Sequence, residues 1–465
     1  MNMETRKPSL ITLADALSID KPSNLAFHRR HLNSRIADLC EIIEADMPLT
    51  RASGSFVWDH AGNRFIDFLS GFAALNIGHN HPVLQEAMDR VKEMVNLVEG
   101  LNTLAGALAH NLVQLAPGNL SRVFFANSGA EVIDASIKLA RAGTGRKKLL
   151  ACNGGFHGRT IGALSVNSRE EFRGPFEPLL IDVAFIPYGD IESLEDELRR
   201  RDVAALILEP IQGEGGMVVP PQGYLAAARE LCTRYGTVLI IDEIQTGLGR
   251  TGKMFAVEHE AVEPDVLLLG KALGGGVMPL SAVLTKDELW IEAGGGTPRS
   301  PFQTPTFGGN TRACAAGLAT LEVLLSEDLA THAATSGSYL LGRLRELQQR
   351  HPLIANVRGR GLMIGIEFAP ATRGLGTLLT AGTLNRLSRE FLSGLVLYEL
   401  RNEHRILTLA TLNDPNVLRA QPPLNIEREN LDKFVDALDN ILTKMANFPR
   451  AALKSWRLLQ RAVSV

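Results

Sequence analysis

Two acidic residues, Asp242 and Glu243, follow an aliphatic run and precede a glycine-rich stretch. A carboxylate in this position could hold a magnesium ion in an ATPase, or it could face the cationic ring nitrogen of an organic cofactor. The ATPase alternative requires the phosphate-binding loop G-x-x-x-x-G-K-[ST]. Its nearest match, "DVLLLGKA" (265–272), lacks both the first glycine and the final hydroxyl residue. The sequence therefore disfavours an ATPase.

Two further apolar runs end in a charged side chain. Glu209 follows "ALIL", and Lys271 follows "DVLLLG" (265–270). Beside so apolar a run the lysine amine would lose solvation, which lowers the pKa of a lysine and makes the amine a usable nucleophile. A lone lysine at a strand end more often extends into solvent. The interpretation of Lys271 therefore depends on the residues that accompany it.

The segment "ANSGAEVIDASIKLARAG" (126–143) predicts a helix that begins with a capping box, Ser128-x-x-Glu131. Taken alone, the box indicates an ordinary capped helix. Ser128, Gly129 and Ala130 also offer a hydroxyl and backbone N–H groups at the positive end of a helix, with no large side chain in the way. Because this helix start follows an apolar run, we interpret it as a phosphate site.

The polar residues at these positions are expected to meet, because ligands of parallel α/β sheets bind beyond the carboxyl ends of the strands. A nicotinamide site is disfavoured, since "GTGRKK" (143–148) lacks the third glycine and follows a helix. A lysine, an acid and a phosphate site together indicate pyridoxal phosphate. Lys271 would form the Schiff base, Asp242 would hold the pyridinium proton, and the helix start would bind the phosphate.

An α/β fold with a mostly parallel central sheet is predicted from seven short apolar runs separated by segments long enough for crossover helices. The runs are 122–126, 148–152, 183–187, 204–209, 237–242, 265–270 and 281–285. Two short strands are expected within 55–71, and "VRGRGLMIGIEF" (357–368) again predicts strand. We predict four parts: an N-terminal segment (1–50), one part of a smaller α+β domain (51–84), a large cofactor-binding domain (85–330) and the rest of the smaller domain (331–465).

Composition narrows the class of protein. The chain has 465 residues, 45% of them hydrophobic, and a formal net charge of −3, which gives no broad basic field for nucleic acid or an anionic membrane. No apolar run approaches the about 18 residues of a membrane span. The four cysteines form no C-x-x-C pair, so no metal site is indicated. We expect a cytoplasmic protein with a small-molecule substrate, without a nucleic-acid or membrane partner.

Several motifs carry a family resemblance that extends from about residue 50 over nearly the whole chain. They are "LEPIQGEGGMVVPPQGYL", "IIDEIQTGLGRTGKMFAVEH", "PDVLLLGKALGGGVMPLSAVLT" and "TFGGN". They resemble the class III, fold-type-I pyridoxal-phosphate aminotransferases of the ornithine, acetylornithine and 4-aminobutyrate type. Within that family, "GKMFAVEHEAVEPD" and "TLNDPNVLRAQPPL" are most similar to putrescine aminotransferases.

The resemblance implies roles for individual residues. Lys271 and Asp242 would be catalytic, and Thr306 of "TFGGN" would reach the phosphate from a second subunit of a homodimer with shared sites. The resemblance also implies a cofactor-binding set: Ser128, Gly129, Ala130, Phe156, which would stack on the ring, His157, Glu209, Asp242, Gln245, near the 3-hydroxyl, Lys271 and Thr306. A regulator without turnover, or a decarboxylase or racemase of the same fold type, stays as an alternative.

The resemblance says less about the substrate. Arg419 matches the family arginine that holds the carboxylate of glutamate or 2-oxoglutarate, and Glu214 matches the acid that pairs with it, while Arg159 is a weaker carboxylate candidate. Phe56 and Phe72 stand where ornithine enzymes of the family carry tyrosines. An apolar entrance favours a terminal amine or aldehyde, such as a diamine or a longer chain of secondary metabolism, with 2-oxoglutarate or pyruvate as acceptor. Ornithine or acetylornithine is the alternative substrate.

Overall fold

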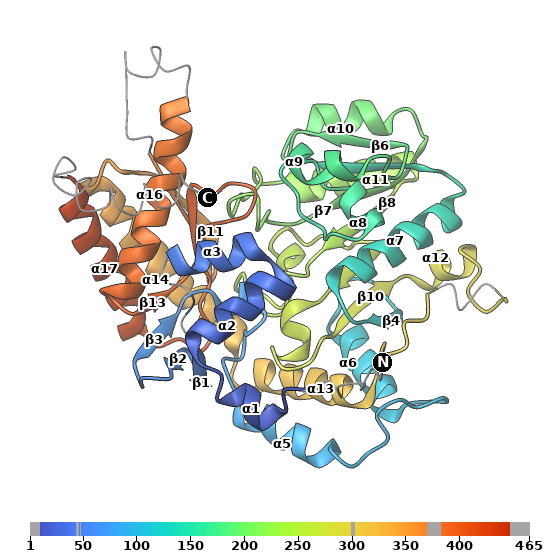
Figure 1. Ribbon diagram of the computed structural model, residues 1–465. Helices are drawn as coiled ribbons and strands as arrows, with labels where there is room; N and C mark the ends of the chain where they lie inside the picture. Colours follow the sequence, from blue (N-terminus) through green and yellow to red (C-terminus); the bar gives the residue numbers. More distant parts are fainter. Residues whose placement is uncertain (1–9, 43–45, 47, 299–302, 370–382, 447–465) are drawn as a thin grey trace, which may run out of the picture. The chain divides into compact units, whose positions relative to one another are not determined.

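The computed structural model describes residues 10–42, 46, 48–298, 303–369 and 383–446 (Figure 1). The chain forms two compact units. The described residues of Met1–Arg51, Trp58–Arg64 and Lys444–Val465 make up one unit, and those of Ala52–Val57 and Phe65–Thr443 make up the other. Every residue predicted for the functional site belongs to the second, larger unit.

Short helices form most of the described part of the smaller unit. They are α1 (Leu13–Leu17), α2 (Lys21–Phe27), a π-helical turn η1 (His28–Leu32) and α3 (Ser34–Ile42). Thr12 caps α1 in a capping box with Asp15, and the side chain of Asp20 caps α2. Arg29 pairs with Asp38 and Glu41 of α3, at 2.6 Å each. Side-chain caps and ion pairs thus stabilise these helices locally.

Seven strands form the central sheet of the larger unit. They are β4 (Arg122–Ala126), β5 (Lys148–Cys152), β6 (Val183–Ile186), β7 (Val203–Leu208), β8 (Val238–Asp242), β9 (Val266–Leu269) and β10 (Ser281–Thr285). Their order is β4-β10-β9-β8-β7-β5-β6. β5 to β9 pair in parallel, whereas β10 runs antiparallel to both β4 and β9. All seven predicted strands and the mostly parallel α/β fold are confirmed.

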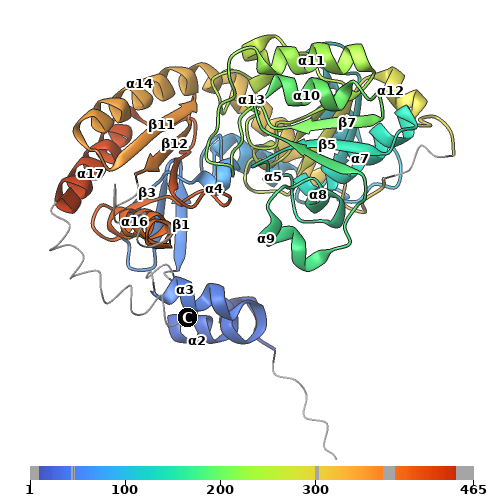
Figure 2. The same cartoon turned by 90° about the horizontal axis from the view of Figure 1, so that it is seen from above.

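Helices cover both faces of this sheet, which explains why every residue of β7, β8 and β9 is buried. Figure 2 shows α10 (Ile191–Leu198) and α11 (Tyr224–Tyr235) on one face, and α7 (Gly129–Thr144) and α8 (Ile161–Ser165) on the other. Val132, Ile133 and Ile137 of α7 pack with strand residues into one hydrophobic core. The core therefore holds the carboxyl ends of β7, β8 and β9 in fixed positions.

Two smaller sheets draw on both ends of the chain. The strands β1 (Leu49–Ser53), β2 (Phe56–Asp59), β3 (Arg64–Asp67) and β13 (Ile406–Leu407) form the first, in that order; β11 (Ile354–Arg360), β12 (Met363–Phe368) and β14 (Val417–Ala420) form the second. The expected pair of short strands within 55–71 is confirmed as β2 and β3. The predicted strand at 357–368 proves to be most of a hairpin, because the chain reverses between β11 and β12.

The other helical elements of the described residues lie between these strands or after the last of them. They are α4 (Ser70–Ala73), α5 (Pro82–Val91), α6 (Thr103–Leu115), α9 (Glu170–Arg173), η2 (Gly174–Phe176), η3 (Ala256–Glu260), η4 (Lys271–Gly274), α12 (Asp287–Glu292), α13 (Thr311–Ser326), α14 (Leu329–Arg350), α16 (Thr383–Asn402) and α17 (Arg428–Ala446). None of the helices in the described ranges is long and apolar enough to cross a membrane.

The short element α4 is a turn of left-handed helix. Ser70, Gly71, Phe72 and Ala73 have φ angles of 44°, 58°, 61° and 66°. Only Gly71 adopts this conformation without strain, and a left-handed residue other than glycine costs on the order of 1–3 kcal/mol. Three such residues within one turn, Ser70, Phe72 and Ala73, persist only where the surrounding structure holds them.

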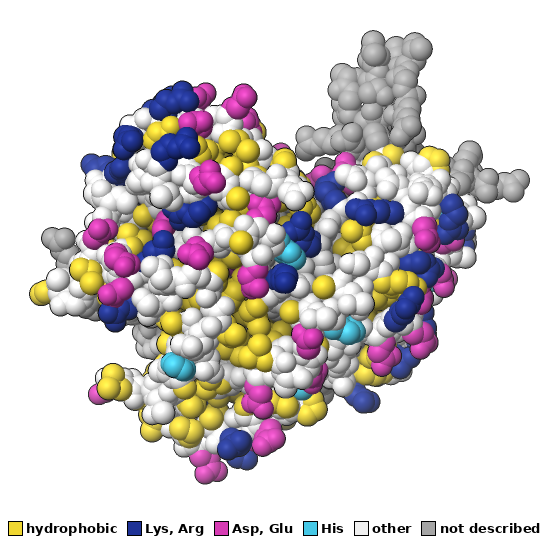
Figure 3. Space-filling model, turned by 180° about the vertical axis from the view of Figure 1, so that it is seen from behind, with side chains coloured by type: hydrophobic (Ala, Val, Ile, Leu, Met, Phe, Trp, Pro, Cys, Tyr) yellow, Lys and Arg dark blue, Asp and Glu magenta, His cyan; other side chains and the backbone are white. Residues whose placement is uncertain are grey.

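Hydrophobic side chains also gather at the surface, as the face of the molecule in Figure 3 shows. Five large exposed ones lie close together in sequence, Met94, Val95, Leu97, Val98 and Leu101. We call these residues the apolar segment 94–101. Exposed apolar surface of this kind is typical of an interaction site.

Candidate functional site

The carboxyl ends of β7, β8 and β9 surround a cavity of about 200 Å³. Nine of the predicted site residues line it: Gly129, Ala130, Phe156, His157, Glu209, Glu214, Asp242, Gln245 and Lys271. Gly158 and Ile244 complete the lining. The predicted convergence of the strand ends is therefore present, because parallel neighbours end at the same edge of the sheet.

Asp242, the last residue of β8, is buried and held on both carboxylate oxygens. Its Oδ2 lies 2.8 Å from Nδ1 of His157, and its Oδ1 accepts a hydrogen bond from the backbone N–H of Ile244 at 3.0 Å. Burial disfavours a charged His157 ring, but the hydrogen bond and the charge of Asp242 outweigh it and raise the pKa of His157. The histidine thus supports a negative charge on Asp242.

Glu243, the second acid of the pair, does not line the cavity. Its Oε2 accepts hydrogen bonds from the N–H of Ala256 and the hydroxyl of Thr246, at 2.8 and 2.9 Å, and its Oε1 accepts one from the N–H of Val257 at 2.9 Å. Burial raises the pKa of Glu243 to about 7. This carboxylate binds the first turn of η3, so the two adjacent acids serve different parts of the structure.

Glu209 follows β7 and binds backbone groups next to the cavity. Its Oε1 accepts the N–H of Phe156 at 2.9 Å, and its Oε2 accepts the N–H of Gly213 at 3.0 Å. Burial raises the pKa of Glu209, while the nearby His157 acts in the opposite direction. Through these two bonds Glu209 fixes the backbone that carries Phe156 and the residue before Glu214.

Lys271 begins η4, and its side chain is half-buried at the cavity. Burial lowers the pKa of its amine, although the negative charges of Glu214, Asp242 and Glu209 oppose the shift. Its backbone is left-handed, with a φ of 41°, and the glycine before it is fully extended. Strain at a residue that lines a cavity is typical of a functional position.

The start of α7 closes one side of the cavity. The predicted capping box is confirmed: Ser128 Oγ accepts the N–H of Glu131, and Glu131 Oε2 accepts the N–H of Ser128. The N–H groups of Gly129 and Ala130 then have no partner within the helix. A Cβ atom at Gly129 would lie 2.9 Å from the side chain of Ile244, so a larger residue does not fit there.

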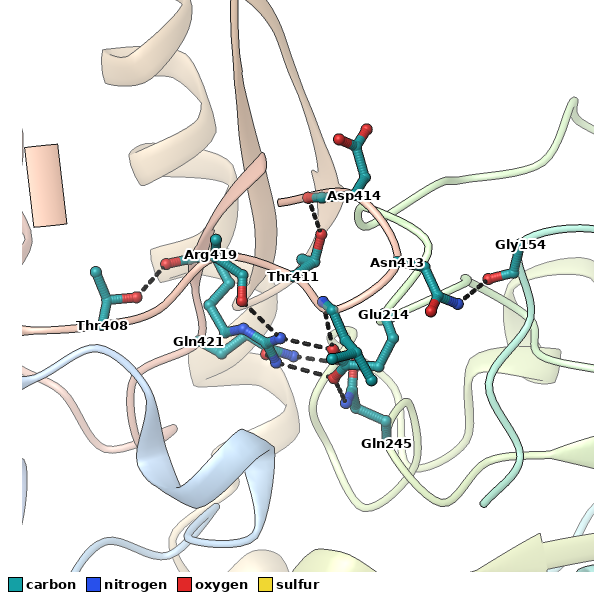
Figure 4. A network of polar contacts seen from close by, with 12 residues as sticks. Gly154, Glu214, Gln245, Thr408, Thr411, Asn413, Asp414, Arg419 and Gln421 are labelled. Atoms are coloured by element: carbon teal, nitrogen blue, oxygen red, sulfur yellow. Dashed lines mark hydrogen bonds and ion pairs between the residues drawn. The ribbon is translucent and has the colours of Figure 1, made fainter. Parts of the chain in front are cut away.

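A bidentate ion pair joins Arg419 of β14 to Glu214 (Figure 4). The two guanidinium nitrogens of Arg419 lie 3.1 and 2.8 Å from the two carboxylate oxygens of Glu214, and both side chains are buried. Glu214 also accepts the N–H of Leu412 at 2.9 Å and faces Gln245 Nε2 at 3.4 Å. Burial alone would raise the pKa of Glu214, but Arg419 outweighs it and lowers that pKa.

The loop before β14 contributes groups that the sequence pattern did not single out. The side chain of Asn413 donates to the backbone oxygen of Gly154 at 3.0 Å, and the N–H of Asn413 donates to the backbone oxygen of Glu214 at 2.9 Å (Figure 4). Gln421 Oε1 lies 3.4 Å from Arg419. The only sequence signal for these residues was their place near Arg419 in "TLNDPNVLRAQPPL".

Six predicted site residues do not line the cavity, and Arg419, which is paired with the lining residue Glu214, is one of them. Phe72 contacts Arg419, whose guanidinium carbon lies 5.0 Å from the centre of the phenylalanine ring. Phe56 is half-buried in β2, and Arg159 is exposed, with its guanidinium stacked on Phe172 at 4.7 Å. The others are Ser128 and Thr306, whose side chains are both exposed, Thr306 in a turn before α13.

Residues 43–442 match the protein family described as aminotransferase class-III. This chain belongs to the class III aminotransferases. Its curated relatives include the aminotransferase PigE of a Serratia species, which is 36% identical over 96% of this chain. The chain spans 57% of the length of PigE.

Solved structures agree with the family assignment. The ornithine aminotransferase of Toxoplasma gondii is 32% identical and superposes with a TM-score of 0.82, over 94% of this chain and 97% of its own. That structure contains pyridoxal phosphate at partial occupancy in its active site. A PLP-bound amine transaminase from an uncultivated Pseudomonas species is 28% identical, with a TM-score of 0.75 over 86% of this chain and 95% of its own.

Pyridoxal phosphate is the cofactor of this class III chain, and the described cavity fits it. A half-buried lysine with a lowered pKa, Lys271, suits covalent attachment of the aldehyde. Asp242, supported by His157, offers a carboxylate to the ring nitrogen. The free N–H groups at the start of α7, opened by the small residue Gly129, suit the phosphate.

Proposed function

We propose that the protein transfers an amino group between a terminal primary amine or its aldehyde and an oxo acid such as 2-oxoglutarate or pyruvate. The observation that carries this proposal is the buried bidentate pair of Arg419 and Glu214 beside Lys271. A guanidinium suits the carboxylate of an oxo acid. Glu214 neutralises that guanidinium while an uncharged or cationic donor occupies the site, so one pocket serves two dissimilar substrates.

When bound, pyridoxal phosphate supplies an electron sink for the electron pair left on the substrate carbon. Lys271 Nζ, whose pKa is lowered by burial, is the nucleophile, and it also accepts the proton that leaves the substrate carbon. Asp242 would hold the protonated ring nitrogen of the bound cofactor. His157, 2.8 Å from Oδ2 of Asp242, orients that carboxylate.

The other cofactor contacts follow from the cavity walls. Gly129 and Ala130 bind the phosphate through their N–H groups. Phe156, whose backbone is fixed by Glu209, would stack on the ring, and Gln245 would lie near the 3-hydroxyl. Ser128 would add its hydroxyl.

Apolar side chains favour a terminal amine as donor. Phe56 and Phe72 offer no hydroxyl to an α-amino acid, and Arg159 stacks on Phe172 outside the cavity. The similarity to an amine transaminase supports this choice, and putrescine is the smallest donor we expect. The similarity to an ornithine aminotransferase supports ornithine or acetylornithine as the alternative.

We further propose a homodimer with shared sites in the cytoplasm. The exposed turn that carries Thr306 and the apolar segment 94–101 are surfaces that a second copy would cover, and Thr306 would then reach the partner's phosphate. The four free cysteines are typical of a reducing compartment.

A screen of donors and acceptors on the purified, cofactor-loaded protein tests the proposal. Putrescine, cadaverine and longer alkyl amines are compared with ornithine and acetylornithine, each with 2-oxoglutarate and with pyruvate. We expect the terminal amines to give the highest specificity constants. A wide margin in favour of ornithine or acetylornithine would replace the terminal-amine proposal with its alternative.

A further inference from the structure

Arg250, in the loop after β8, is a fully buried cation whose hydrogen bonds all go to uncharged groups. Its acceptors are the backbone oxygens of Leu362 and Pro422, at 3.0 and 2.6 Å, Asn76 Oδ1 at 2.6 Å and Ser70 Oγ at 3.4 Å. Burial lowers the pKa of Arg250, and the charge of Asp67 opposes this shift. Burying a guanidinium without a bound carboxylate is unfavourable, so its position needs an explanation.

The bonds of Arg250 join three segments that are far apart in sequence. Asn76, one acceptor, donates in turn to the backbone oxygen of Leu248 at 2.7 Å. Ser70, another acceptor, donates to the backbone oxygen of Gln421 at 2.6 Å. Through its guanidinium, the loop after β8 is therefore bonded to three other segments: the stretch from Ser70 of α4 to Asn76, the turn between β11 and β12, and the chain after β14.

The turn α4 depends on these contacts, because Ser70, Phe72 and Ala73 are left-handed without being glycine. Asp67 Oδ1 accepts the N–H groups of Leu69 and Ser70, each at 2.8 Å, at the start of the turn. Arg250 and the backbone oxygen of Gln421 hold the hydroxyl of Ser70 from the other side. The surroundings thus hold the turn at its first residue.

The turn α4 places Phe72 against the guanidinium of Arg419. Phe72, two residues after Ser70, has its ring 5.0 Å from the guanidinium carbon of Arg419, within the range of a cation–π contact. The contacts therefore run in series from Arg250 through Ser70 and Phe72 to Arg419. Phe72 contacts the guanidinium through a partner other than Glu214.

We propose that Arg250 is a positioning residue for the acceptor: it fixes the left-handed turn so that Phe72 keeps the guanidinium of Arg419 in place for the carboxylate of the oxo acid. This inference rests on the proposed function of Arg419. Arg250 itself does not line the cavity and touches no reacting atom. A purely structural role, in which Arg250 only joins three segments, is the alternative that the experiment must exclude.

The test uses the cofactor-loaded enzyme and follows the donor and acceptor half-reactions separately. Arg250→Lys keeps the positive charge and loses the two-nitrogen hydrogen bonding of the guanidinium. Phe72→Leu keeps an apolar side chain and loses the aromatic face. Each variant should lower the ratio of the 2-oxoglutarate to the donor specificity constant by about 3- to 30-fold, through the KM for 2-oxoglutarate. The double variant should be no worse than the more affected single variant, because both changes remove the same contact.

Two further variants separate the expected effect from misfolding and from a general loss of activity. Ser70→Ala removes the hydroxyl that links Arg250 to the turn and leaves Arg250 in place. It should lower the same ratio of specificity constants, and it serves as the test if Arg250→Lys does not fold. Arg146→Lys is the matched control, because Arg146 also donates to backbone oxygens, those of Val203, Tyr235 and Gly236, without lining the cavity. It should leave the ratio of the two half-reactions unchanged.

Three outcomes would overturn the inference: a ratio that stays constant in Arg250→Lys or Ser70→Ala, an equal loss in both half-reactions, or additive effects in the double variant. Arg419→Ala separates this failure from that of the proposed function. If Arg419→Ala leaves the acceptor half-reaction intact, the proposed function fails. If it weakens that half-reaction while the Arg250 and Phe72 variants do not, only the role of Arg250 is wrong.

Discussion

The pair of Arg419 and Glu214 allows a quantitative prediction for the acceptor half-reaction. In Arg419→Ala, the carboxylate of 2-oxoglutarate loses a buried, bidentate partner of the kind that Glu214 now engages at 3.1 and 2.8 Å. Removing one partner of such a pair costs ~2 to 5 kcal/mol. At about 1.4 kcal/mol per factor of ten, the specificity constant for 2-oxoglutarate should fall from about 30-fold to several thousandfold.

The single variant also leaves the Glu214 carboxylate buried without its guanidinium. The pKa of Glu214 should then rise, because burial disfavours the charge that Arg419 now stabilises. Any charge that remains would act on Lys271, whose pKa already responds to Glu214. The double variant Arg419→Ala with Glu214→Gln removes this side effect, so it should spare the donor half-reaction while the acceptor half-reaction stays weak.

Single-turnover absorbance changes of the bound cofactor measure each half-reaction, first with an amine donor and then with 2-oxoglutarate. Arg159→Ala is the control, because Arg159 is the other arginine considered for a carboxylate, and it is exposed and stacked on Phe172. The reasoning is refuted if the double variant keeps 2-oxoglutarate turnover within about threefold of the parent. It is also refuted if Arg159→Ala shows the larger loss.

Three further predictions concern the cofactor and the pH dependence. Borohydride reduction and peptide mapping should place the cofactor on Lys271, and Lys271→Ala should lose turnover; an adduct on Lys286 would contradict the assignment. Asp242→Asn should fold normally and lose several orders of magnitude in rate, because a neutral amide cannot hold the ring charge; near-normal rates would contradict this. Because the pKa of Glu214 is lowered in the folded protein, its contribution to stability is complete above its ordinary value of 4.5 and is lost as the pH falls through the lowered pKa. The difference in the free energy of unfolding between the parent and Glu214→Gln should therefore shrink as the pH falls below about 4.5. Chemical denaturation at several pH values measures this difference, and a difference that does not change with pH would contradict the prediction.

The sequence by itself determined the features that depend on neighbouring residues. Seven apolar runs became the seven strands of the central sheet, and Ser128 and Glu131 formed the predicted capping box. Parallel strands end at one edge, so the residues that follow them, including Asp242 and Lys271, were predictable as neighbours. The order β4-β10-β9-β8-β7-β5-β6 was not predictable, because strand pairing depends on contacts between segments far apart in sequence.

Only the tertiary structure decided what each polar group does. Asp242 and Glu243 are adjacent and both are carboxylic acids, yet one lines the cavity and the other binds the first turn of η3, because successive side chains leave a strand end in different directions. The ion pair of Glu214 with Arg419 joins residues that no local pattern relates, although the family resemblance suggested it. Arg250 carried no signal of its own, since a guanidinium that binds only backbone oxygens and neutral side chains is recognisable solely from the segments that fold around it.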